Sequence, residues 1–454
     1  MKIADVLGIS EAKLICGNPE EQLGCFSKDT RTINRGDVYI AFCGENFDGN
    51  DFFGDAFSKE AKTCILSKLE NEEEVKKQYL DKNIILVRDT IEFITELAKK
   101  KRETIHVPVI AVTGSVGKTS TKNLIASVLE QKYTVLKTQG NLNTNIGLSL
   151  TLLGYQNEEC IVLEMGMNTF GEISTLSNIA KPTIAVITNI GTSHIGNLGS
   201  RENILKAKLE ILEGLTGPIL VNNDNDLLHK WGTNNQEREI ITFGIAEESD
   251  YQATDIHYSK NGSSFYLKNQ EYQIPVYGKA FIYNSLVAYA IGKMLDINDE
   301  DIRYAYQKQK SEEHRMCKIE ACNFLILDDT YNSSYDSLVL ALDVLKSFSA
   351  RKIAVLGDIL ELGEFSEKIH RDIGELVLNT HVDLLVTVGE LSKYINEEAM
   401  KLGLNIDSCF HFDKNEEAID FLKNNIKAKD VVLVKASHAM NFGQIVDELK
   451  VWEF

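Results

Sequence analysis

A glycine-rich segment near residue 115 is the clearest place in this sequence for phosphate chemistry. The apolar run 107–112 leads into Thr113, Gly114, Ser115, Val116, Gly117, Lys118, Thr119 and Ser120. A strand, a glycine loop and a helix start in that order allow backbone N–H groups to hold phosphate oxygens. Lys118 can neutralise the β- and γ-phosphates, and the Thr119 hydroxyl can bind the accompanying Mg²⁺. The segment predicts a nucleoside triphosphate site; a tight turn with an exposed lysine is the alternative.

A lysine interrupts the apolar face of a second expected element. On a helix over residues 203–215, with about 100° per residue, one face carries Ile204, Leu205, Leu209, Ile211, Leu212 and Leu215, with Lys208 in its middle. Lys206, Glu210 and Glu213 lie on the opposite side, as solvated charges should. Because an unpaired buried ammonium is costly, Lys208 must snorkel, pair with a carboxylate or be chemically modified.

Two further side chains follow apolar runs directly. Glu164 closes the run 160–163, and His194 comes shortly after the run 184–187. In α/β proteins the carboxyl ends of parallel strands bind ligands, so the Glu164 carboxylate could hold Mg²⁺. His194 is a second candidate, although a lone loop histidine is more often a surface residue.

The elements that must position these residues predict three α/β domains. β-branched runs alternate with helix-like stretches in the middle of the chain and again after residue 312, which is typical of buried parallel sheets. We expect a small domain over 1–100, a doubly wound ATP-binding domain over 101–312 and a Rossmann-like domain over 313–454. The basic stretch 99–103 is either a linker or the last turn of a helix.

Composition excludes several classes of protein. The 454 residues are 43% hydrophobic and 25% charged, and the eight cysteines are scattered without metal-ligand spacing. A net charge of −19 disfavours nucleic acid and anionic membranes as partners. The sequence has no apolar run long enough to cross a bilayer and no signal peptide, which predicts a cytoplasmic protein.

The loop departs from a standard P-loop, because Val112 stands at the position of the first glycine. The resulting TGxxGKT form resembles the Mur ligase superfamily, which includes the cell-wall ligases and folylpolyglutamate synthetase. Further similarities run along the chain in the superfamily's order: 29–31 (DTR), 44–49 (GENFDG), 141–147 (NLNTNIG), 164–168 (EMGMN), 188–191 (TNIG), 314–316 (HRM), 328–332 (DDTYN) and 356–363 (LGDILELG). The LGDxxELG form favours the branch that adds D-alanyl-D-alanine.

This resemblance implies roles for particular residues. Lys208 would be carbamylated, and Thr119, Glu164, His194 and Lys208 would bind two Mg²⁺ ions. Lys118, Lys208, His194 and Arg315 would be catalytic, while Asn284, Arg315 and Asp329 would join segment 113–120 in nucleotide binding. Substrate contacts would come from Asp29, Thr30, Arg31, Asn46, Asp48, Gly49, Asn141, Thr144, Asn145 and Asn332.

The implied reaction is the ATP-dependent addition of D-alanyl-D-alanine to UDP-N-acetylmuramoyl-tripeptide, through an acyl phosphate, by a monomer. Where the family usually reads GxHNxxN, this chain reads Gly278 to Asn284 without the first His-Asn pair, and the usual terminal KGSR is Lys435-Ala436-Ser437-His438. Another Mur-type ligase and a non-catalytic nucleotide-binding paralogue are therefore the alternatives.

Overall fold

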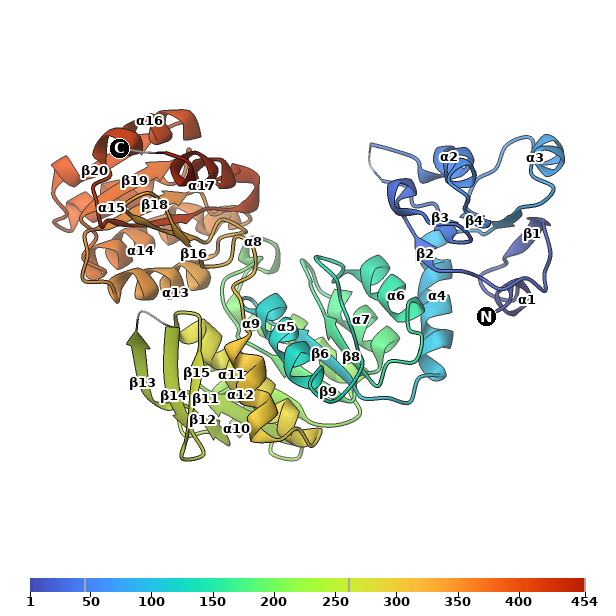
Figure 1. Cartoon of the computed structure of the whole chain (residues 1–454), viewed down its shortest axis with the longest axis horizontal. Coiled ribbons are helices and arrows are strands. Elements are labelled where there is room, and N and C mark those ends of the chain that lie inside the picture. The colour runs from blue at the N-terminus through green and yellow to red at the C-terminus, as the bar shows by residue number, and fades with distance from the viewer. Residues whose placement is uncertain (45, 260–261, 453–454) are drawn as a thin grey trace.

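The chain folds into three α/β parts arranged around separate sheets (Figure 1). The structure is a computed structural model and describes residues 1–44, 46–259 and 262–452. Glu45 of the GENFDG stretch thus lies outside the described residues. Within that part of the chain, no helix is both long and apolar enough to span a membrane.

The N-terminal part is built on a five-stranded sheet. Its order is β1 (Lys13–Cys16), β5 (Asn83–Leu86), β4 (Thr63–Leu66), β3 (Val38–Ile40) and β2 (Phe26–Ser27), with only the β1–β5 pair antiparallel. Helices α1 (Ile3–Val6), α2 (Phe53–Ser58) and α3 (Glu72–Gln78) and the 3₁₀ turns Thr30–Thr32 and Gly49–Phe52 complete it.

Helix α4 (Thr90–Glu103) joins the first two parts. Asp89 caps its start by accepting from the N–H groups of Ile91 and Glu92 at 2.7 and 2.8 Å. Apolar residues of α4 pack on the N-terminal sheet and against α6 (Asn145–Leu153) of the middle part. At its far end the buried Arg102 donates to the carbonyls of Ala180 and Lys181. The stretch 99–103 is therefore the last turn of a helix.

The middle part contains the predicted doubly wound sheet, with seven parallel strands. Its order is β12 (Tyr251–Gln252), β11 (Ile240–Gly244), β10 (Ile219–Asn222), β9 (Ile184–Ile187), β6 (Val109–Thr113), β8 (Cys160–Glu164) and β7 (Val135–Lys137). The central strands are buried on both faces, because helices cover each side. The further helices are α5 (Lys118–Leu129), α7 (Glu172–Ala180), α8 (Ile195–Leu198), α9 (Arg201–Leu209), α10 (Asp226–Thr233), α11 (Lys279–Met294) and α12 (Asp299–Gln307).

Two features of the middle part differ from expectation. A three-stranded antiparallel sheet, β13 (Thr254–Ser259), β14 (Gly262–Leu267) and β15 (Gln270–Ile274), follows the parallel strands and was not predicted. The helix expected over 203–215 ends as α9 at Leu209 and continues as a 3₁₀ turn, Glu210–Glu213. Glu210 is not simply solvated, because its carboxylate accepts from the N–H of Gly171 at the start of α7.

The C-terminal part is a Rossmann-like sheet of six strands. Its order is β16 (Cys317–Glu320), β17 (Leu325–Asp328), β21 (Val431–Lys435), β18 (Lys352–Gly357), β19 (Leu384–Val388) and β20 (Cys409–Phe412), with β16 alone antiparallel. Helices α13 (Tyr335–Lys346), α14 (Ser366–Asn379), α15 (Lys393–Lys401), α16 (Asn415–Asn425) and α17 (Gly443–Lys450) flank it.

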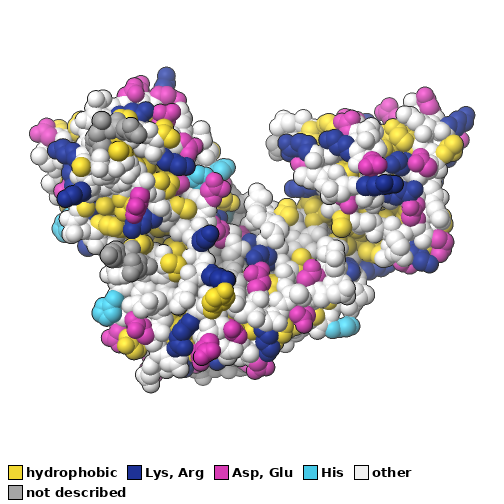
Figure 2. All heavy atoms as spheres, viewed as in Figure 1, with side chains coloured by type: hydrophobic (Ala, Val, Ile, Leu, Met, Phe, Trp, Pro, Cys, Tyr) yellow, Lys and Arg dark blue, Asp and Glu magenta, His cyan; other side chains and the backbone are white. Residues whose placement is uncertain are grey.

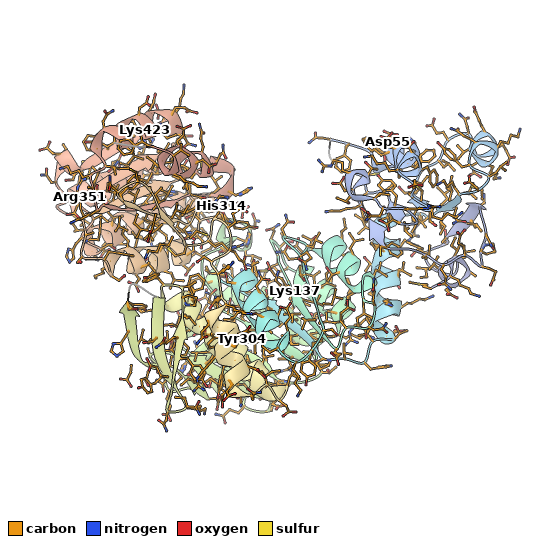
Figure 3. The ribbon with its side chains drawn as sticks, in the orientation of Figure 1. Asp55, Lys137, Tyr304, His314, Arg351 and Lys423 are labelled. Carbon is orange, nitrogen blue, oxygen red and sulfur yellow. The ribbon has the colours of Figure 1, made fainter. Side chains whose placement is uncertain are left out.

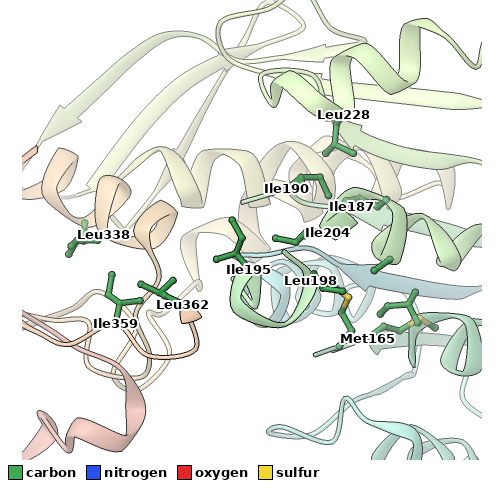
Figure 4. Close-up of a cluster of buried hydrophobic side chains, with 14 of the residues drawn as sticks. Met165, Ile187, Ile190, Ile195, Leu198, Ile204, Leu228, Leu338, Ile359 and Leu362 are labelled. Carbon is green, nitrogen blue, oxygen red and sulfur yellow. The ribbon is translucent and has the colours of Figure 1, made fainter. Parts of the chain in front are cut away.

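The three parts enclose an open space. In Figure 2 the surface is hollowed between the N-terminal and C-terminal parts, above the middle one. The C-terminal part packs on the middle part through apolar side chains, with Leu362 and Ile359 facing Ile195 (Figure 4). Figure 3 shows His314 on the side of the C-terminal part that faces the other two parts.

Candidate active site

The glycine loop between β6 and α5 has the backbone that phosphate binding requires. Gly114 and Gly117 have φ of +148° and +86°, which favour glycine. A Cβ on Gly114 would lie 1.9 Å from Thr188 Oγ1, so no larger residue fits there. Lys118 begins α5, which leaves the first N–H groups of the helix available to an anion.

Asn189, which was not predicted as a site residue, holds this loop in shape. Its Oδ1 accepts from the N–H groups of Ser115 and Val116 at 3.0 and 2.9 Å. Thr188 Oγ1 donates to the Val116 carbonyl at 2.6 Å. Both residues follow β9, so the end of the neighbouring strand fixes the phosphate loop. The TNIG similarity is the one signal in the sequence that pointed to them.

Two cationic side chains lie at the loop. Lys118 Nζ donates to the Gly114 carbonyl at 2.8 Å, and burial lowers the pKa of Lys118. Arg315 Nη2 donates to Thr119 Oγ1 at 3.2 Å, and its guanidinium lies 3.7 Å from the centre of the Tyr331 ring. Arg315 comes from the C-terminal part, so the two parts meet at the loop.

A pocket of about 310 Å³ opens from the loop toward α13. The segment Ser115 to Ser120 lines one end, and Arg315, Asp329, Asn332 and Lys435 of the C-terminal part line the opposite wall. Away from the phosphate end the lining is more apolar: Tyr277, Ala280, Phe281, Leu340, Ala341 and Val344. Asn284 also lines the pocket and accepts from Thr121 Oγ1 at 2.8 Å. A phosphate loop beside a partly apolar lining is the combination that a nucleotide site needs.

Glu164 reaches the same pocket from the end of β8. It is 2% exposed, and Asn143 Nδ2 donates to its Oε1 at 2.8 Å. Its Oε2 is buried without a hydrogen-bond partner among the described residues. A buried carboxylate oxygen of this kind is suited to a cation. Asn143, which was not predicted as a site residue, therefore orients this carboxylate.

Lys208 is buried as predicted, at 2% exposed. Burial lowers the pKa of Lys208 well below its usual value, and the charge of Lys118 acts in the same direction. Across the described residues no hydrogen bond or ion pair to its ammonium is found. Of the three predicted outcomes, a carboxylate partner is therefore not seen within one chain.

His194 lies beside the pocket, and its neighbour Ser193 lines it. Its backbone is left-handed, with φ +63°. The Nδ1 atom lies 2.9 Å from Oε2 of Glu361 in the C-terminal part, without the alignment of a hydrogen bond. Burial lowers the pKa of His194, and the nearby Glu361 carboxylate only partly opposes this effect.

Glu164, Lys208 and His194 fit a cation site only in part. In the described ranges no three His, Cys, Asp or Glu side chains form a metal-binding group. A divalent ion here would need oxygen ligands from Glu164, from a modified Lys208, from Thr119 and from phosphate. The unpartnered Glu164 oxygen and the unpaired Lys208 are compatible with that set.

Asp329 and Asn332 face the pocket from the C-terminal part. Asp329 Oδ2 accepts from Lys435 Nζ at 2.6 Å, and its Oδ1 accepts from the N–H of Met316 at 3.0 Å. Lys435 also donates to the Asn332 carbonyl at 2.9 Å. The sequence analysis named Lys435 only as part of the segment 435–438 and gave it no role. In the structure this buried lysine holds Asp329 and Asn332 together on the C-terminal side of the pocket.

The other predicted substrate residues lie away from this pocket. Asp29 caps the turn Thr30–Thr32 and pairs with Arg31 at 2.7 Å, which lowers the pKa of Asp29 to about 2. Asp48 and Gly49 begin the turn Gly49–Phe52, with Asn46 exposed beside them. Asn141 and Thr144 are exposed, and Asn145 accepts from Thr95 on α4 at 3.0 Å. They belong to the N-terminal part and to its junction with the middle part.

Comparison with known proteins gives matches over nearly the whole chain. Two family models match, the Mur ligase middle domain over residues 112–292 and the Mur ligase, glutamate ligase domain over residues 314–438. The chain is 37% identical to the UDP-N-acetylmuramoyl-tripeptide–D-alanyl-D-alanine ligase of Bacillus subtilis, with 93% of this chain and 92% of that protein covered. The enzyme of the same name from Escherichia coli is 32% identical, with 94% of each covered.

Solved structures agree. A crystal structure of MurF from Acinetobacter baumannii matches with a TM-score of 0.88 and 27% identity, covering 99% of this chain and 98% of that one. MurF ligase from Thermotoga maritima in complex with ADP matches with a TM-score of 0.82 and 28% identity, covering 94% and 97%.

Proposed function

The chain belongs to the Mur ligase family, and from that premise we propose that it joins D-alanyl-D-alanine to UDP-N-acetylmuramoyl-tripeptide with consumption of ATP. One observation carries the proposal. The phosphate loop of the middle part and Arg315, Asp329 and Lys435 of the C-terminal part line a single pocket. Relatives that bear this enzyme's name match the chain over more than nine-tenths of its length.

The reaction has two steps. A carboxylate oxygen of the tripeptide attacks the γ-phosphorus of ATP, the bond to the bridging oxygen breaks, and ADP leaves. The amine of D-alanyl-D-alanine then attacks the acyl-phosphate carbonyl, loses a proton, and phosphate departs with its C–O bonding pair. Lys118 and Arg315 lie where they can offset the phosphate charge of the first step.

We assign the metal ligands to Thr119, Glu164, His194 and a carbamylated Lys208, which would hold two Mg²⁺ ions. Bound there, the ions would offset negative charge on the phosphates and the carboxylate. Carbamylation turns an ammonium into a carboxylate, which suits a lysine that is buried without an ion-pair partner among the described residues. Its lowered pKa favours the neutral amine that reacts with carbon dioxide.

The remaining assignments follow from the same reaction. Asp29, Thr30, Arg31, Asn46, Asp48 and Gly49 would bind the uridine diphosphate end, and Asn141, Thr144, Asn145 and Asn332 the peptide end. The domains would be 1–100 for the nucleotide-linked sugar, 101–312 for ATP and 313–454 for closing the site. We further propose that the protein works in the cytoplasm as a monomer, because one chain supplies both walls of the nucleotide pocket.

The test is phosphate release from ATP and Mg²⁺ with UDP-N-acetylmuramoyl-tripeptide, with and without D-alanyl-D-alanine, and with the product identified by mass. We expect release that depends on the dipeptide and a pentapeptide nucleotide as product. Lys118→Met, shown to be folded by circular dichroism, should lose turnover. If folded wild-type protein gives no turnover with this or any other dipeptide, the chain is a binding paralogue or acts on another acid.

A further inference from the structure

The segment 188–196 lies between the phosphate loop and the C-terminal part. On the loop side, Asn189 holds the N–H groups of Ser115 and Val116, and the N–H of Gly191 donates to Ser115 Oγ at 2.9 Å. These bonds join the end of β9 to the loop at several adjacent atoms. A shift of the segment must therefore move the groups that face the phosphates.

The C-terminal part holds the same segment from the other side. Asp336, in the first turn of α13, accepts from the N–H and the hydroxyl of Thr192 at 2.6 and 2.9 Å. A Cβ on Gly191 would lie 2.2 Å from Asp336 Oδ2, so the carboxylate rests directly on the backbone. Further along, the N–H of Gly196 donates to the Glu361 carbonyl at 3.2 Å.

Helix α13 also forms one wall of the nucleotide pocket. Ser337, Leu340, Ala341 and Val344 of this helix line the pocket. An ion pair, Lys279 to Asp343 at 3.0 Å, also joins the helix to the middle part, but both side chains are nearly half exposed. That pair does not touch the segment 188–196. Helix α13 thus carries two acidic residues that contact the middle part, Asp336 and Asp343. Only Asp336 is linked to the phosphate loop, through its hydrogen bonds to Thr192.

We propose that Asp336 is a positioning residue for the nucleotide, which makes the shape of the phosphate loop depend on the docking of the C-terminal part. The connection runs from Asp336 through Thr192 and Asn189 to the N–H groups of Ser115 and Val116. By linkage, a nucleotide on the loop strengthens docking as much as docking strengthens nucleotide binding. The inference rests on the proposed function, since it takes the nucleotide to bind at this loop.

The first test is the affinity of the full chain for ADP, measured by calorimetry without any ligase assay. Asp336→Ala should weaken binding by about fivefold or more. Asp336→Asn should fall between it and the wild type, because its amide oxygen can still accept one bond. Asp343→Asn, the matched control, should bind like the wild type. If Asp336→Ala does not fold, Thr192→Val removes the hydroxyl from the other side of the contact.

A second test asks whether Asp336 acts through Asn189. With Asn189→Ala as the background, Asp336→Ala should lose most of its effect on ADP affinity, because the path to the loop is already broken. Fully additive effects would overturn the inference, as would an Asp336→Ala that binds ADP like the wild type. Wild-type protein that binds no ADP would instead overturn the proposed function.

Discussion

At the level of single residues, two buried side chains, Glu164 and Lys208, lack the partners that burial usually requires. Glu164 keeps one carboxylate oxygen without a partner among the described residues, and Lys208 lies at 2% exposure with a strongly lowered pKa. Neither arrangement favours stability, because buried polar groups are costly unless they are paired. Both are the kind of local cost that proteins retain at functional sites.

Glu164→Gln tests the cation site. The amide keeps the oxygen that accepts from Asn143 but loses the charge, so the fold should persist. We expect turnover to fall by about a hundredfold or more and the Mg²⁺ concentration for half-maximal activity to rise. Turnover measured across a magnesium series checks this, with Glu202→Gln on the exposed face of α9 as the control. An unchanged magnesium dependence would contradict the assignment.

Lys208→Met tests the cost of the buried amine. Because the pKa of Lys208 is lowered in the folded protein, the unfolded chain binds more protons between that pKa and about 10.4. The stability of the wild type relative to Lys208→Met should therefore rise with pH across this window and be lowest below it. Thermal unfolding from pH 6 to pH 10 measures it, with the exposed Lys206→Met as the control.

Bicarbonate extends the same experiment. Added bicarbonate should stabilise the wild type, since carbamylation of the folded state draws the equilibrium toward it. It should leave Lys208→Met unchanged, and an equal response of both proteins would argue against carbamylation.

At the scale of elements, the sheets were predictable and the contacts between elements were not. The apolar runs at 160–163, 184–187 and 353–356 fall within β8, β9 and β18, because strands buried on both faces leave a continuous apolar signal. The antiparallel sheet β13 to β15 was missed because none of its strands carries a continuous apolar run: β13 is largely exposed, β14 is mostly buried but begins Gly-Ser-Ser, and β15 is mainly polar. Asn189 and Asp336 were missed for another reason: their partners are distant in sequence, and only packing brings them together.

A hydrogen bond between helix α14 and the segment that follows β18 should depend on pH. The Nε2 of His370 accepts from the N–H of Ile359 at 3.0 Å, and its Nδ1 lies 2.7 Å from the Ser366 carbonyl, which requires a neutral ring. Burial lowers the pKa of His370. As pH falls below about 6.5, the unfolded chain takes up the proton first, so stability is lost until the folded pKa is reached.

The expected result is faster hydrogen exchange of the α14 amides at pH 5.5 than at pH 7.5, after correction for intrinsic exchange rates. His370→Gln should be less protected at neutral pH but lose this extra acid sensitivity. Replacing the exposed His257 by Gln should change neither quantity. Equal acid sensitivity in His370→Gln and wild type would show that another group is responsible.

At the scale of the whole molecule, the C-terminal part is docked while the N-terminal part stands apart across the open space (Figure 2). A compact chain of this length would have a radius of gyration of about 22 Å. We expect the free protein to exceed that value and small-angle scattering to show a decrease toward it when the UDP-tripeptide and an ATP analogue are added together. Either ligand alone should give a smaller change, and no change with both would mean that the reaction proceeds in the open arrangement.

Helix α4 sets how such a movement can proceed. It is anchored at one end by Arg102 on carbonyls at the end of α7 and packs along α6, while its other end carries the N-terminal sheet. A rotation about Arg102, with sliding along α6, would make the helix a lever arm about 20 Å long. Turning it by about 10° carries the far end through roughly 3 Å. A slight rearrangement of three hydrogen bonds at the fulcrum is thus amplified into a displacement as large as the gap between a nucleophile and its target.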